Sequence, residues 1–88
     1  MRRTFKEHIT GYCLCKQIKY IEHDDPWELD INDGHIKITK NKNGEYDLVD
    51  RELGIQVTYK ASAWDLACDI IGYSINHEEP KTTQKDYN

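Results

Sequence analysis

The sequence predicts a two-layer α+β fold, in which an antiparallel β-meander of four to five strands carries one N-terminal and one C-terminal helix on one face. Apolar and polar residues alternate with a period of two through the middle of the chain, which is typical of half-buried strands. Closer to the C-terminus, apolar residues recur at spacings of three and four, which is typical of an amphipathic helix. The 88 residues, 38% of them hydrophobic, can build one small core.

The N-terminal quarter holds two competing sets of apolar residues. They would lie on opposite faces of one helix: Phe5, Ile9, Tyr12 and Cys13 against Leu14, Ile18 and Ile21. Because such a helix would be apolar all round, we divide the segment into a helix over residues 5–16, capped by Thr4, and a strand over residues 17–22. The pattern alone leaves residues 12–22 open between helix and strand.

The loop after this first strand is expected to contain residues 23–26. A four-residue loop there opposes Tyr20 with Leu29 and places both on the same apolar face. It also opposes Ile18 with Ile31, so the apolar pattern supports the division of the N-terminal segment.

Three glycine-containing turns predict the rest of the meander. Asp33-Gly34 favours a two-residue hairpin, and residues 42–44 favour a three-residue loop with Gly44 in the left-handed position. Residues 51–54 then form a four-residue loop. In these registers the turns oppose Ile31 with Ile36, Ile38 with Leu48, and Leu48 with Val57.

The C-terminal helix is expected to begin after Ser62 as the N-cap, with Asp65 favouring its first turn, and to end near Asn76. Its apolar stripe contains Trp64, Leu66, Cys68, Ile70, Ile71 and Ile75. We therefore expect a single domain over residues 1–79 and a flexible tail over residues 80–88.

Cysteine usage and hydropathy point to a cytoplasmic protein. An odd number of cysteines cannot complete a disulfide framework within one chain, so reduced thiols are expected. No apolar run approaches the length of a membrane-spanning helix, and no signal peptide follows Met1. Abundant Ile, Lys and Asp with little Ala suggest AT-rich codons, and hence a bacterial host with a low-GC genome.

Charge is distributed unevenly along the chain. Residues 1–20 hold five Lys or Arg side chains, whereas residues 21–36 hold six carboxylates and neither Lys nor Arg. The basic residues are Arg2, Arg3, Lys6, Lys16 and Lys19; the acidic residues, which we call the acidic set, are Glu22, Asp24, Asp25, Glu28, Asp30 and Asp33. A duplex-DNA binder needs a clustered cationic face, so we do not expect direct nucleic-acid binding.

Catalytic and metal-binding motifs are weak. Cys13 and Cys15 lie two residues apart, and on a helix their side chains point in nearly opposite directions, so we expect neither a metal nor a cofactor there. His23 with the two aspartates that follow it could act as a general base, but consecutive polar residues before a proline are expected in any turn. We therefore expect no catalytic residues and no enzyme.

The function predicted is that of a small acidic protein-interaction module, with the acidic set as its contact residues. In size and acidity the chain is similar to the accessory proteins that phages and mobile elements encode to inhibit host nucleic-acid enzymes, including anti-CRISPR and anti-restriction inhibitors. The alternative is a nucleic-acid-binding or regulatory module that uses the basic N-terminus. In either case the two sheet edges allow a homodimer.

Overall fold

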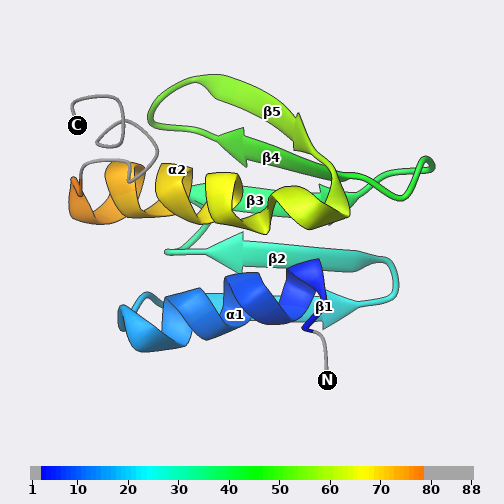
Figure 1. The fold of residues 1–88 in the computed structure, drawn as a ribbon. Coiled ribbons are helices and arrows are strands. Elements are labelled where there is room, and N and C mark those ends of the chain that lie inside the picture. The colour runs from blue at the N-terminus through cyan, green and yellow to red at the C-terminus, as the bar shows by residue number, and fades with distance from the viewer. Residues whose placement is uncertain (1–2, 79–88) are drawn as a thin grey trace, which may run out of the picture.

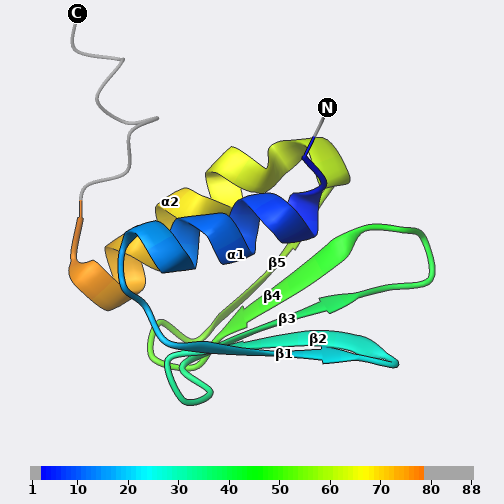
Figure 2. The ribbon, with the colours of Figure 1, turned by 90° about the horizontal axis from the view of Figure 1, so that it is seen from below.

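A computed structural model describes residues 3–78 and shows the predicted two-layer arrangement. The order is α1 (Phe5–Cys15), β1 (Tyr20–Asp24), β2 (Trp27–Ile31), β3 (Ile36–Lys40), β4 (Tyr46–Asp50), β5 (Ile55–Tyr59), the 3₁₀ turn η1 (Ala61–Ala63) and α2 (Trp64–Asn76). The strands form one five-stranded sheet in sequence order, with antiparallel neighbours. Both helices run side by side in the same direction on one face of the sheet (Figures 1 and 2). The expected tail over residues 80–88 lies outside the described residues.

Helix α1 begins as its sequence predicts. The Thr4 hydroxyl accepts a hydrogen bond from the backbone N–H of Glu7, and the Glu7 carboxylate accepts one from the N–H of Thr4, which completes a capping box. One side of the helix packs against the sheet and belongs to the core. Its buried residues are Phe5, Ile9 and Cys13.

The three predicted turns and their registers are confirmed. Ile31 lies opposite Ile36, Ile38 opposite Leu48, and Leu48 opposite Val57. The glycines at positions 34, 44 and 54 all have positive φ, a conformation that costs glycine little because it has no Cβ. The apolar face that the alternation predicts is thus one continuous surface beneath the helices.

The first strand differs from the prediction in both its position and its register. β1 begins at Tyr20, and Tyr20 lies opposite Ile31 rather than Leu29. The N–H groups of Gln17 and Ile18 donate to the carbonyls of Leu14 and Cys13, so these residues close the end of α1 instead of starting a strand.

At the other end of β1, Asp25 and Pro26 alone form the turn, and the peptide bond between them is cis. His23 and Asp24, which we expected in a four-residue loop, remain paired in the strand. A shift of two residues preserves which side chains face inward, so the apolar face is unchanged although the register is wrong.

The start of α2 is also corrected. Residues 61–63 form a 3₁₀ turn in which the N–H of Ala63 donates to the carbonyl of Lys60, and no side chain caps the helix. Ser62 lies inside this turn and is therefore not the N-cap. Cys68 and Ile71 are buried as predicted, but Leu66 is 43% exposed and lies outside the stripe.

The core lies between the helices and the inner face of the sheet. Phe5 stacks on Tyr46 with 4.0 Å between the ring centroids, and Trp27 meets the edge of Tyr46 at 5.7 Å. The Trp27 indole N–H reaches outward and donates to Glu22 Oε2 at 2.8 Å.

Neither helix within residues 3–78 is long and apolar enough to cross a membrane.

Candidate functional site: the open face of the sheet

Within residues 3–78, no element covers the face of the sheet opposite the helices (Figure 2). We call it the open face. The pleat directs alternate side chains of every strand onto it: Ile21, His23, Glu28, Asp30, Lys37, Thr39, Asp47, Val49, Gln56 and Thr58. These positions are half-buried or exposed, whereas most of their neighbours along the strands belong to the core. The open face is therefore the side of the sheet that the two helices leave free.

Two apolar side chains lie within this polar surface. One cross-strand row contains Ile21, Asp30, Lys37 and Val49 in adjacent strands. Ile21 is 52% exposed and Val49 39% exposed. A sheet surface that met only water would be expected to carry polar residues at such positions, so these two residues can contribute apolar contacts to a docking surface.

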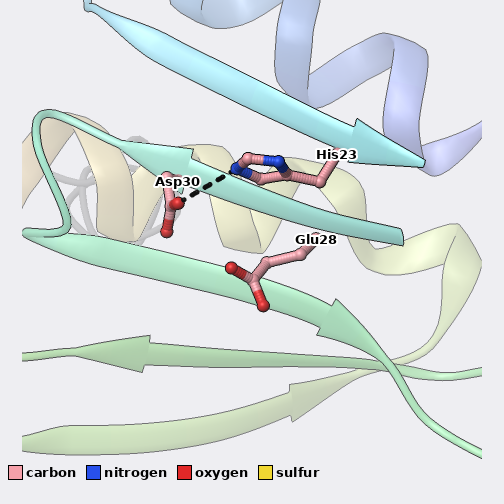
Figure 3. A group of neighbouring side chains, drawn as sticks. All are labelled: His23, Glu28 and Asp30. Carbon is pink, nitrogen blue, oxygen red and sulfur yellow. Dashed lines mark ion pairs between the residues drawn. The ribbon is translucent and has the colours of Figure 1, made fainter. Parts of the chain in front are cut away.

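The charged groups of the open face are already paired with one another. His23 Nε2 lies 3.4 Å from Asp30 Oδ2, and Lys37 Nζ lies 3.5 Å from Glu28 Oε2. Figure 3 shows His23 and Asp30 pointing toward each other, while the Glu28 carboxylate extends over the neighbouring strand β3. Further along the sheet, the Thr58 hydroxyl donates to Asp47 Oδ1 at 2.6 Å. These contacts link side chains of neighbouring strands, although pairs as exposed as these contribute little to stability.

The structure separates the acidic set into three groups. Glu28 and Asp30 lie on the open face. Glu22 and Asp24 point to the other side of β1, and Asp25 lies in the turn that follows. Asp33 is at the opposite end of β2, in the turn to β3. The predicted contact residues therefore do not form one surface.

The Asp33 end of the open face contains cations as well as carboxylates. Lys19 Nζ pairs with Asp33 Oδ1 at 2.9 Å. A shallow hollow of about 290 Å³ lies beside this pair, and Ile21, Lys37 and Arg51 contribute to its lining. The open face thus presents charges of both signs rather than an acidic strip.

The basic residues of the N-terminal segment are dispersed. Lys16 pairs with Glu78 at 3.2 Å, Lys19 pairs with Asp33, and Lys6 lies over the ring of Trp27 at 4.9 Å. Arg2 is outside the described residues. A phosphate-binding patch requires several cations directed at one surface, and these side chains contact three different parts of the molecule.

A second hollow, of about 280 Å³, lies between the two helices. Its lining includes His8 and Trp64, whose rings stack at a centroid distance of 3.7 Å. Tyr12 also lines this hollow, and its hydroxyl lies close to Gly72. Burial raises the pKa of the Tyr12 hydroxyl to about 12, and the nearby carboxylate of Glu78 adds to this effect. At ordinary pH the groove therefore contains a neutral phenol.

A buried polar cluster joins α2 to the sheet. His35 Nε2 lies 2.7 Å from Ser74 Oγ and 3.6 Å from Asp50 Oδ1. Serine, histidine and aspartate also form hydrolase triads, but there the acid contacts the ring nitrogen opposite the serine. Here Asp50 approaches the same nitrogen as Ser74, and the carboxylate near the other nitrogen, Glu52 Oε2 at 3.5 Å from His35 Nδ1, belongs to a side chain that is 71% exposed. Ser74, His35 and Asp50 are each at most about a tenth exposed, so the serine hydroxyl is not presented at the surface. We interpret the cluster as a structural link.

Asp50 also organises the turn between β4 and β5. Its Oδ1 accepts hydrogen bonds from the backbone N–H groups of Glu52 and Leu53, at 2.9 and 3.0 Å. The same carboxylate lies beneath His35, so one buried aspartate connects this turn to the β2–β3 turn. The alternation in β4 places Asp50 on the same side as Leu48, but the contacts of its carboxylate depend on the β4–β5 turn and on His35, which the pattern does not reveal.

The group formed by His23, Glu28 and Asp30 was also missed from the sequence. In the predicted register His23 belonged to a loop, next to Asp24 and Asp25 in the chain. In the structure it lies directly opposite Glu28, and Asp24 points to the other side of the strand. The two-residue error in register therefore concealed the contact between these three side chains.

Comparison with known proteins yields no match: no family model fits the chain, and no curated protein or solved structure is significantly similar to it.

Proposed function

We propose that the protein is a non-enzymatic binding module that docks on a partner protein through the open face of its sheet. The observation that carries this proposal is the pair of exposed apolar residues, Ile21 and Val49, within an uncovered and otherwise polar sheet surface. Protein interfaces combine apolar contacts with polar groups and charges of both signs, and on the open face Ile21 and Val49 flank the charged residues Asp30 and Lys37 in one cross-strand row.

The charge pattern favours a partner with a basic surface. Around the β1–β2 turn, Glu28 lies on the open face, Asp24 on the opposite side of β1 and Asp25 in the turn itself, so this corner of the molecule carries carboxylates on both faces. Such a corner suits the phosphate-binding surface of a nucleic-acid enzyme, where carboxylates take the place of phosphates. This supports the more specific role of a phage or mobile-element inhibitor of a host enzyme.

A pair of double variants tests the docking surface. Ile21→Lys with Val49→Glu replaces both apolar side chains without changing the net charge, and each new charge lies opposite a residue of the other sign, Asp30 or Lys37. The matched control is Leu14→Lys with Leu66→Glu, which changes exposed apolar residues of the two helices in the same way.

The tagged wild type and both variants are incubated with nuclease-treated bacterial lysate, and the retained proteins are quantified by mass spectrometry. We expect a protein that the wild type and the helix variant retain equally and the sheet variant loses at least tenfold. Equal retention by all three proteins, or loss only with the helix variant, would show that the open face is not the docking surface.

Charge-reversal variants distinguish an inhibitor that binds a basic partner from a docking module with any other partner. Asp24→Lys with Asp25→Lys should abolish binding to a basic partner, whereas Glu45→Lys with Asp65→Lys, which makes the same change in net charge elsewhere, should weaken binding far less. Equal effects would indicate that net charge alone, and not the acidic corner, governs the interaction.

A further inference from the structure

A mixed set of ligand groups lies on the open face, at the strand pair β1–β2. His23, Glu28 and Asp30 each offer one metal-ligating atom, and these atoms all lie within 4.8 Å of one another (Figure 3). We propose that this triad binds a divalent first-row transition-metal ion, for which Zn²⁺ has the most suitable coordination. The proposal goes beyond the docking role and does not depend on it.

The distance between two of the three ligand atoms fits a small ion. Zinc lies about 2.0–2.2 Å from nitrogen and oxygen ligands, so two ligands of a tetrahedral site are about 3.4 Å apart. His23 Nε2 and Asp30 Oδ2 are separated by 3.4 Å. Glu28, which is partly exposed, can bring its carboxylate to the same centre by a change of side-chain torsion.

The sheet provides a rigid scaffold for the three residues. His23 and Glu28 are directly opposed in the β1–β2 ladder, and Asp30 follows Glu28 by two residues, so all three side chains project from the same face. Because β2 is also hydrogen-bonded to β3, the two carboxylates come from an interior strand whose backbone is paired on both sides. Sites on strands are held more precisely than sites on loops.

The chemistry of the ligands selects the class of ion. Imidazole with carboxylates suits zinc and other first-row transition ions, whereas Ca²⁺ and Mg²⁺ prefer ligand sets made only of oxygen. Two carboxylates also neutralise a divalent charge. Three protein ligands leave a coordination position for water or for a side chain of another molecule, as in open zinc sites.

Lys37 opposes ion binding and thereby supplies a sharp test. Its ammonium group pairs with Glu28 Oε2 at 3.5 Å, so the metal must displace it or tolerate a positive charge nearby. Replacement of this lysine by glutamine, which is uncharged, should increase the affinity for the ion. A cation bound farther from this lysine than the Debye length, about 10 Å, would respond much less.

The experiment is a calorimetric titration of the chelator-treated full chain with ZnCl₂, alongside NMR spectra of the histidine rings. We expect one ion per chain, a shift of the His23 ring signals, at least a tenfold loss of affinity for His23→Gln and for Asp30→Asn, and a severalfold gain for Lys37→Gln. Cys15→Ser serves as the control, because Cys15 is an exposed thiol on α1 that could bind zinc itself.

Affinity that is unchanged in His23→Gln, or that disappears in Cys15→Ser, would overturn the proposal. So would the absence of any zinc binding by the wild type. Circular dichroism of each variant checks that the fold is intact. Because the titration contains no partner protein, a negative result leaves the docking proposal standing, and a failure to find a partner leaves the metal proposal standing.

Discussion

Gly72 lies where the side chain of Tyr12 crosses between the two helices. A Cβ atom built at this position would overlap the Tyr12 hydroxyl, while the ring carbon that carries this hydroxyl would remain at an ordinary contact distance of 3.5 Å. Glycine in a helix costs about 1 kcal/mol relative to alanine. The close approach of Tyr12 explains why the helix nevertheless carries glycine here.

This contact predicts that Gly72→Ala changes the free energy of unfolding in opposite directions in the wild type and in the Tyr12→Phe variant. Gly72→Ala should lower the free energy of unfolding in the wild type, because Tyr12 must move away. In a Tyr12→Phe background the same change should raise it by about 1 kcal/mol, through helix propensity. Urea denaturation of the four proteins forms a double-mutant cycle, and additive effects would contradict the proposed overlap.

The buried thiol of Cys13 predicts a dependence of stability on alkaline pH. Burial raises the pKa of Cys13 from 9.0 to about 11, so the folded protein holds this proton more tightly than the unfolded chain does. The contribution of the protonated Cys13 thiol to the free energy of unfolding is fully present below pH 9, and it is lost as the pH rises from 9 to 11.

Denaturation curves at pH 8, 9, 10 and 11 measure this effect. Cys13→Ala should be less stable than the wild type at pH 8 but should lose less stability as the pH rises. Alkylation provides a second measurement: at pH 8 the exposed Cys15 should react before the buried Cys13. Parallel pH profiles for the two proteins would show that Cys13 does not retain its proton in the folded state.

At the scale of elements, the two helix starts differ in a way that mutation can detect. Thr4→Ala removes the hydroxyl that caps α1 and should cost about 1 kcal/mol. Ser62→Ala should change the free energy of unfolding by much less, because Ser62 lies in η1 and caps no helix. Thermal denaturation compares the two, and equal losses would place Ser62 at the helix start after all.

The sheet was predictable where the turns contain glycine. The positions of Gly34, Gly44 and Gly54, combined with the alternation of the strands, favour one register in which every apolar side chain of β2 to β5 except Val49 faces the helices. The β1–β2 turn has no glycine, and registers two residues apart satisfy the alternation equally well. The pattern therefore identified the inner face of β1 but not its register.

The candidate site was less predictable for the same reason. The open face follows from the alternation, so the sequence indicated Ile21 and Val49 as outward-facing residues. Contacts across strands depend on the register, and the error at β1 placed His23 in a loop, away from Glu28. The continuous acidic segment was also misleading, because alternation and turns direct its members to both faces and both ends of the sheet.

At the scale of the whole molecule, the two faces of the sheet differ in what covers them. Both helices, the buried aromatic residues and the His35 cluster stabilise one side. The other side carries Ile21, Val49 and paired charges that contribute little to the core, and both the docking proposal and the metal proposal concern this side. Changes there should alter binding more than stability, because exposed positions contribute little to the free energy of folding.

Lysine footprinting of the protein with its captured partner tests the central claim most directly. Lys37 lies on the open face, whereas Lys16 lies at the end of α1 on the side of the helices. If the open face is the docking surface, partner binding should slow acetylation of Lys37 severalfold and leave that of Lys16 unchanged. Protection of Lys16 with unchanged reactivity of Lys37 would contradict the account and would assign the interaction to the helices.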